Sequence, residues 1–269
     1  MLTHSTSPIL AIDQHPLYPH IVVTAGMDGC YHIVNLETTE LIQCGKDHSK
    51  YVVRAKFSPD GKFLVTASYD RTVNLYEFVP EGPGFQHVNQ INCRGPVEAI
   101  CFLPPPNMST DIYTLVLGIR EENYLHYVSL DKDAGFPSVK FNMNENGDDW
   151  VSFTPMHLEV SPSNKHIACY TDSSAGRIII FRAFSSDQVV NLYGVNVDGF
   201  SQPRCCWDET GKYIFATSDD YKIWVFDVVS GNVVEKLSGH SAVIRDLKLD
   251  KEAGRVVSCG FDKNIIVWD

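Results

Sequence analysis

Short runs of alternating apolar and polar residues recur along the whole chain, and turn residues separate one run from the next. In the segment 232–269 the alternation marks four runs, at Val233–Leu237, Ile244–Leu249, Arg255–Cys259 and Asn264–Trp268. A period of two residues is typical of β-strands that turn one face towards a core. The segment therefore predicts four short antiparallel strands joined by tight turns.

The segment 47–78 shows the same rhythm. Residues 58–61 (Ser-Pro-Asp-Gly) form a predicted tight turn, because proline presets φ and glycine accepts a positive φ. Tyr76 stands where the last segment has Trp268, and each of these aromatic residues lies six positions beyond a turn aspartate. The two segments are therefore copies of one unit.

Four further segments keep the strand rhythm with weaker turn signals. The first and fifth units, 8–36 and 188–227, retain recognisable turns, whereas the third and fourth keep only their strands. The strands of those two units are predicted at Val97–Leu103, Ile112–Gly118, Tyr124–Leu130, Met156–Val160, His166–Thr171 and Arg177–Phe181. The segments 104–109 and 131–150 interrupt the rhythm and are predicted as loops of the kind that tolerate insertion.

A Gly-His pair at 239–240 and a Trp-Asp pair at 268–269 frame the last unit. That spacing, with four strands per unit, resembles the WD-repeat β-propeller family. The resemblance implies an all-β fold of four-stranded antiparallel blades, with six repeats visible, which form either a six-bladed ring or part of a seven-bladed one. It also implies a single domain over 1–269, with repeats at approximately 1–38, 39–80, 85–131, 137–184, 187–229 and 232–269.

The same resemblance implies a polar network in each complete blade, which links a histidine, a Ser or Thr, the turn aspartate and a strand aromatic. The complete sets are His240, Ser258, Asp262 and Trp268 in the last unit, and His48, Thr66, Asp70 and Tyr76 in the second. The first unit offers His4, Thr24 and Asp28. A Ser-His-Asp set resembles a catalytic triad, but a nucleophile needs only one copy beside an oxyanion hole, and this set recurs. We therefore assign it a structural role and predict no catalytic residue.

Charge and cysteine usage narrow the functional classes. The formal net charge of −11 argues against a nucleic-acid backbone as the main ligand. The eight cysteines show no CxxC spacing, so we expect reduced thiols, no metal site and no cofactor. Cys205 and Cys206 lie in a strand pattern whose successive side chains face opposite ways, which favours packing over reactivity. With no secretory signal and no membrane-spanning apolar run visible, the sequence predicts a cytoplasmic or nuclear protein that is not secreted and not bound to a membrane.

The starts of the inner strands are the predicted binding surface, because a propeller gathers them on one face. Reading that column across the units gives these candidate partner-binding residues: Tyr51, Arg54, Glu98, His157, Phe200, Arg204, Arg245 and Asp246. Aromatic residues and arginine are enriched in binding hot spots. The three arginines would form a positive spot for an acidic or phosphorylated peptide. Alternatively, each arginine pairs with an acidic neighbour such as Asp246 or Glu98.

These patterns favour a non-catalytic scaffold or adaptor that binds protein or peptide partners on the propeller face and rim within a multiprotein complex. A first alternative is the substrate-recognition subunit of a cullin-RING ubiquitin ligase, although no Arg follows the Trp-Asp or Phe-Asp pairs in register. A second is a subunit of an RNA-processing or chromatin complex. The third is a propeller enzyme, a hydrolase or lyase, to which only His157 and Arg204 would contribute, and no acid–base pair is evident.

Overall fold

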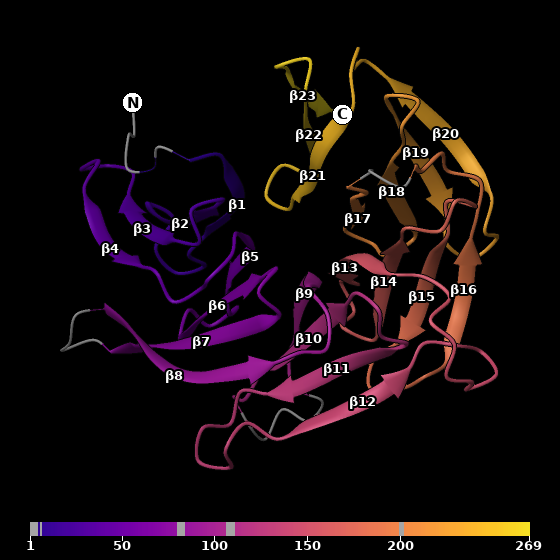
Figure 1. Cartoon of the computed structure of the whole chain (residues 1–269). Helices are drawn as coiled ribbons and strands as arrows, with labels where there is room; N and C mark the ends of the chain where they lie inside the picture. Colours follow the sequence, from indigo (N-terminus) through magenta and orange to yellow (C-terminus); the bar gives the residue numbers. More distant parts are fainter. Residues whose placement is uncertain (1–4, 6, 80–83, 106–110, 199–201) are drawn as a thin grey trace. The chain divides into compact units, whose positions relative to one another are not determined.

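The structure is a computed structural model that describes residues 5, 7–79, 84–105, 111–198 and 202–269. Within these residues the chain forms twenty-three β-strands and no helix. The strands build six antiparallel sheets, and consecutive strands are neighbours in each sheet (Figure 1). The predicted fold class, an all-β chain of antiparallel β-propeller blades with six repeats, is confirmed.

Five of the sheets have four strands and the sixth has three within the described residues. The first three sheets contain β1 (Ile9–Gln14), β2 (Ile21–Gly26), β3 (Tyr31–Asn35) and β4 (Leu41–Gly45); β5 (Val52–Phe57), β6 (Phe63–Ser68), β7 (Thr72–Val79) and β8 (Gly84–Asn92); and β9 (Val97–Leu103), β10 (Thr114–Ile119), β11 (Tyr124–Ser129) and β12 (Ser138–Asn142). The last three contain β13 (Pro155–Val160), β14 (His166–Thr171), β15 (Ile178–Arg182) and β16 (Gln188–Leu192); β17 (Cys205–Trp207), β18 (Tyr213–Thr217), β19 (Lys222–Asp227) and β20 (Val233–Ser238); and β21 (Ile244–Asp250), β22 (Arg255–Gly260) and β23 (Ile265–Trp268).

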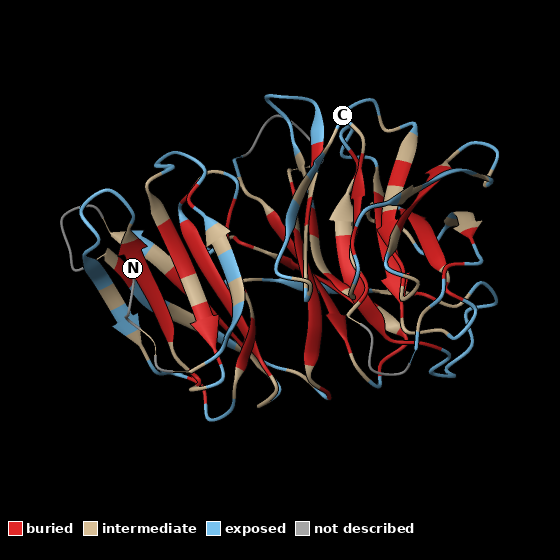
Figure 2. Cartoon of the chain, turned by 90° about the horizontal axis from the view of Figure 1, so that it is seen from above, coloured by how far each residue is buried: buried red, intermediate tan, exposed pale blue. Residues whose placement is uncertain are grey.

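The chain divides into two compact units. Unit 1 comprises residues 1–102 and 119–122, and unit 2 comprises residues 103–118 and 123–269. Unit 1 contains the first two sheets and most of β9, and unit 2 contains the remaining strands. Buried residues lie mainly along the strands, and exposed residues lie mainly in the connecting loops (Figure 2).

The core of unit 1 forms between its two complete sheets. The first strands of these sheets, β1 and β5, lie beside each other. Val23 and Ile33 from one sheet pack in a single cluster with Phe57 and Leu64 from the other, and all four are buried. Each such side chain contributes about 1.5–3 kcal/mol when it is removed from water. Neither sheet could hide these residues alone, so stacking stabilises both.

Two clusters in the core of unit 2 lie on opposite faces of the fifth sheet. Cys205 packs with Tyr170 of the fourth sheet, whereas the adjacent Cys206 packs with Ile244 and Leu247 of the sixth. Successive residues of a strand face opposite sides, so two neighbouring thiols enter two different clusters. Burial raises the pKa of both thiols, and they remain neutral packing groups. The structure therefore places the Cys-Cys pair as the strand alternation predicts.

A β-bulge recurs at one position of the first strand in four sheets. The register shifts within β1, β5, β13 and β21, and the extra residues are Leu10, Val53, Met156 and Arg245. A bulge bends its strand and re-aims the neighbouring side chains. The bulges therefore change the direction of the side chains that the sequence analysis selected as candidate partner contacts.

The structure differs from the sequence prediction mainly in one connecting segment. Residues 131–150 are predicted as a loop, but they contain β12, the outer strand of the third sheet. No residue of β12 is fully buried, so its hydrophobic alternation is too weak to mark a strand. Residues 106–109 of the other predicted loop lie outside the described residues.

Candidate functional site

The polar network of the sixth sheet runs from the turn into the sheet. His240 Nδ1 lies 2.8 Å from Asp262 Oδ2, and His240 Nε2 lies 2.8 Å from Ser258 Oγ. The indole Nε1–H of Trp268 donates to the same Ser258 oxygen at 2.8 Å. One direction of donation satisfies all four residues: indole to hydroxyl, hydroxyl to Nε2, and Nδ1–H to carboxylate. Ser258 is 1% exposed, and its Oγ is bonded to both the imidazole and the indole, an arrangement that suits a structural role.

The second sheet repeats this arrangement with a different outer end. His48 Nε2 lies 2.8 Å from Thr66 Oγ1, and His48 Nδ1 lies 3.1 Å from Asp70 Oδ2. Tyr76 interacts with Thr66, as Trp268 does with Ser258, but its hydroxyl also donates to Asp47 Oδ2 at 2.9 Å. The sequence analysis did not anticipate Asp47 as a member. In the first unit, His4 lies outside the described residues.

Burial and hydrogen bonding shift the titration of these networks. Burial lowers the pKa of His48 more than Asp70 raises it. Burial alone would raise the pKa of Asp70, but hydrogen bonds from Thr72 and from the Ser49 N–H hold it below its ordinary value. The pKa of Asp262 falls to about 2, chiefly because the Ser241 N–H donates to its carboxylate. A neutral imidazole beside an ionised carboxylate fits a structural network.

In unit 1 the predicted partner residues meet two residues that sequence reasoning missed. The Tyr51 ring lies 4.7 Å from the Tyr69 ring, centroid to centroid, and the Tyr69 hydroxyl donates to Glu98 at 2.7 Å. Arg120 holds the same carboxylate oxygen through Nε and Nη2, both at 2.9 Å. Glu98 is only 1% exposed, so it orients its neighbours from below the surface.

Arg54, the remaining candidate in unit 1, is half-buried beside the β5 bulge. Its Nη1 donates to the carbonyl of Val53 at 2.7 Å.

Burial, followed by the hydrogen bond to Glu98, raises the pKa of Tyr69 to about 12. The tyrosine hydroxyl therefore stays a donor, which keeps the aromatic pair fixed at this end of β5.

In unit 2 the structure brings Arg204 and Asp246 together. Arg204 Nε lies 3.7 Å from Asp246 Oδ1, and the guanidinium also donates to the Pro203 carbonyl at 3.1 Å. Arg245 lies over the ring of Phe261, with Cζ 5.0 Å from the ring centroid. Phe261 is 65% exposed, so this Arg–Phe pair is presented to solvent.

One other candidate of unit 2 is less available. His157 is buried, and its Nδ1 accepts the N–H of Cys205 at 3.3 Å. Phe200 lies outside the described residues. The sequence did carry a signal for the missed Phe261 and Tyr69, since both directly precede a turn aspartate.

Two features that would indicate other functions, a metal site and a membrane-spanning helix, are absent from the described part of the chain. No group of three or more His, Cys, Asp and Glu side chains is arranged there to hold a metal ion. No helix within those residues has the length and apolar character required to cross a membrane.

The sequence matches the family model of the WD domain, G-beta repeat, at residues 39–77 and 231–269. These are the segments that contain the two complete polar networks. The family prediction is therefore confirmed, and it was carried by the two units with the clearest turns.

Curated relatives cover most of this chain at low identity. The transcriptional corepressor LEUNIG_HOMOLOG of Arabidopsis thaliana is 20% identical over 92% of the chain and 33% of its own length. The COMPASS component SWD2 of Saccharomyces cerevisiae is 24% identical over 75% of the chain and 58% of its own length. Apoptotic protease-activating factor 1 of Mus musculus is 22% identical over 94% of the chain and 18% of its own length. The chain thus spans less than two thirds of each of these relatives.

Proposed function

We propose that this WD-repeat protein is a non-catalytic scaffold or adaptor that binds protein or peptide partners at the ends of its first strands. The recurrent bulge carries the proposal. At equivalent positions the four sheets carry different residues, of which Leu10 and Arg245 reach solvent whereas Val53 and Met156 are buried. The adjoining residues include an aromatic pair in unit 1 and an Arg–Phe pair in unit 2. A repeated backbone with varied side chains suits partner recognition.

The names of two relatives support membership of a multiprotein assembly. One is a component of COMPASS and another is a transcriptional corepressor. The U5 small nuclear ribonucleoprotein 40 kDa protein of Homo sapiens is 27% identical over 31% of this chain and 24% of its own length. We extend this to the present chain as a subunit of a nuclear or cytoplasmic complex. All eight cysteines are free thiols, which agrees with a reducing compartment.

An acidic or phosphorylated peptide is one proposed class of partner, bound by Arg54 in unit 1 or by Arg204 and Arg245 in unit 2. The ion pair to Asp246 opposes this for Arg204, because a ligand would have to displace a carboxylate already at 3.7 Å. Arg245 is the better placed of the two in unit 2, since it lies over an exposed ring. Of the two arginines in unit 2, we therefore expect Arg245 to contribute more than Arg204 to binding such a peptide.

Affinity purification of the tagged protein tests the proposal. We expect proteins to co-purify in stoichiometric amounts with the wild type and with Lys251→Glu, a matched charge reversal on an exposed turn. Arg245→Glu combined with Phe261→Ala should reduce capture at least about tenfold, as expected for loss of a hot spot. Thermal unfolding of each variant verifies its fold. Purification of a chain without partners, together with turnover in a substrate screen, would contradict the proposal.

A further inference from the structure

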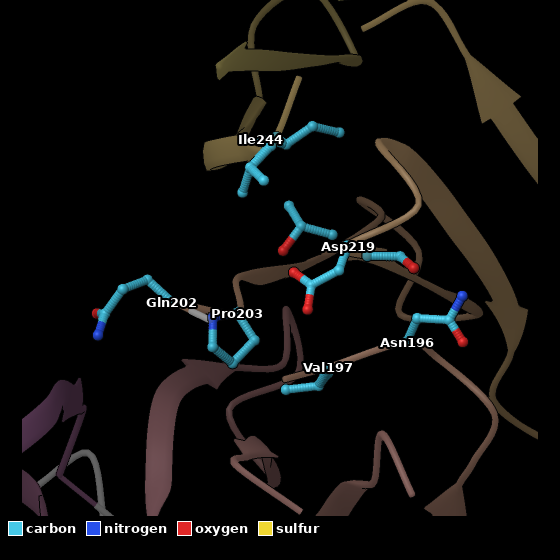
Figure 3. Close-up of a pocket in the computed structure, with 9 residues that line it drawn as sticks. Asn196, Val197, Gln202, Pro203, Asp219 and Ile244 are labelled. Atoms are coloured by element: carbon cyan, nitrogen blue, oxygen red, sulfur yellow. The ribbon is translucent and has the colours of Figure 1, made fainter. Parts of the chain in front are cut away.

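A small cavity lies within unit 2, between the fifth and sixth sheets. It is lined by the turn that follows β18, by the residues before β17 and by the start of β21. The room for the centre of a water-sized group in this cavity is only about 10 Å³. The cavity thus accepts one small group at the end of a thin chain. Figure 3 shows the side chains that surround it.

One buried hydroxyl in this cavity lacks a partner. Ser218 is 3% exposed, and its Oγ makes no hydrogen bond within the described residues. Buried hydroxyls are nearly always hydrogen-bonded. The equivalent Ser68 in the second sheet follows this rule, because its Oγ donates to the Tyr51 carbonyl at 2.9 Å. The same turn position is therefore satisfied in one sheet and open in the other.

The other lining groups give the cavity a negative, acceptor-rich end and apolar walls. Asp219 is the charged residue among the lining side chains, and the N–H of Asp198 donates to its Oδ2 at 2.7 Å. In Figure 3 its carboxylate points into the space bounded by Val197, Pro203 and Ile244. A carboxylate and a hydroxyl can accept several donors at once.

We propose that this cavity binds the ammonium group of a lysine from an extended segment of a protein partner, a site that rests on the proposed partner-binding function. The ammonium offers three donors, which suit Ser218 and Asp219, and the methylenes of lysine suit the apolar walls. A guanidinium has four heavy atoms and exceeds the room available. The net charge of −11 draws a basic segment towards the protein.

A titration of the ¹⁵N-labelled protein with short peptides tests the site. The probe is a capped peptide with one lysine among glycines and alanines, and its counterparts carry norleucine, Nε-acetyl-lysine or arginine instead. We expect the lysine peptide to shift the amide signals of Ser218, Asp219 and Ile244 in a saturable way, more weakly at high salt. The other three peptides should bind at least about tenfold more weakly.

Two variants and one control connect the binding to these residues. Ser218→Ala and Asp219→Asn should each weaken the lysine peptide several-fold, whereas Ser68→Ala, the same change in the second sheet, should leave its affinity unchanged. Equal affinity for the norleucine peptide, signal shifts confined to other regions, or a cavity that holds only water would overturn the lysine site. If partner proteins still co-purify but the lysine peptide does not bind, the lysine site is wrong and the proposed scaffold function stands. Lysine binding without any co-purifying partner supports the site and removes the proposed function.

Discussion

The second and sixth sheets contain the same polar network, but the aromatic residue at its end is more buried in the second sheet. In the second sheet β8 pairs along the whole of β7, and Tyr76 is 1% exposed. In the sixth sheet, within the described residues, Ile265 of β23 is 74% exposed. The Asp–His–hydroxyl trio forms in both, with histidine-to-hydroxyl distances of 2.8 Å. The geometry of the trio is therefore set by the spacing of turn and strand, whereas the burial of the aromatic residue at its end is set by the surrounding residues.

The largest difference between the two networks should come from their aspartates. Asp70 accepts from His48, the Ser49 N–H and both the N–H and Oγ1 of Thr72, whereas beside Asp262 the equivalent of Thr72 is Asn264, whose N–H donates. Asp70→Ala should lower the free energy of unfolding by about 3 kcal/mol, because the buried His48 and the half-buried Thr72 lose their acceptor. Asp262→Ala should cost less. Urea denaturation measures both, and an equal loss would contradict the ranking.

The aromatic residues should give the next largest effect. Tyr76→Phe removes a buried donor to Asp47, and we expect a loss of about 1.5 kcal/mol. Trp268→Tyr removes the indole donor to Ser258, but Trp268 is only half-buried, so water can replace it and the loss should be smaller. Thermal unfolding of both variants decides this. A larger loss for Trp268 would show that its greater exposure does not weaken its hydrogen bond.

A pH series sharpens the comparison further. Because the pKa of His48 is lowered in the folded state, the unfolded chain binds its proton more readily. Stability should therefore be complete above about pH 6.5 and fall as the pH decreases below it, by at most about 1.4 kcal/mol per pH unit for one proton.

The same series needs a variant to isolate this histidine. Burial also lowers the pKa of His15 and His166, so they contribute a slope of the same sign. In His48→Asn the slope between about pH 7.5 and 5.5 should decrease without vanishing. Urea unfolding at each pH provides the measurement, and an unchanged slope would mean that His48 titrates alike in both states.

The smallest expected effect extends the comparison to the fifth sheet. Ser68→Ala removes a buried hydrogen bond and should destabilise the protein by about 1 kcal/mol. Ser218→Ala removes a hydroxyl without a partner, so the free energy of unfolding should stay the same or rise slightly. Destabilisation by Ser218→Ala, measured by urea unfolding, would indicate a structural partner for its Oγ and remove the basis of the lysine site.

The strands were predictable wherever one face is buried. The prediction of His166–Thr171 agrees with β14, and that of Val97–Leu103 agrees with β9, because each has a nearly continuous buried run. The outer strand β12 was missed, since exposure removes the alternation that marks a strand. Repeat spacing also selected the histidine and the hydroxyl that meet in each polar network, because these residues recur at fixed offsets, but it did not select Asp47.

The candidate surface was less predictable because it depends on contacts between distant segments. Arg120 holds Glu98, and Phe261 supports Arg245, yet neither partner belongs to the inner-strand column from which candidates were chosen. The bulges could not be predicted from residue type, since the extra residue is as different as Val53 in one sheet and Arg245 in another. The open hydroxyl of Ser218 is visible only when the surrounding side chains are placed.

The strand β17 has one further consequence. Its two adjacent sulfur atoms belong to separate hydrophobic clusters, one shared with the fourth sheet and one with the sixth. Alkylation of either thiol requires local opening of its own cluster, since both are protected and neutral. The alkylation rates of Cys205 and Cys206 can therefore differ although the two residues are adjacent. The faster rate would identify the side of the fifth sheet that separates first from its neighbour.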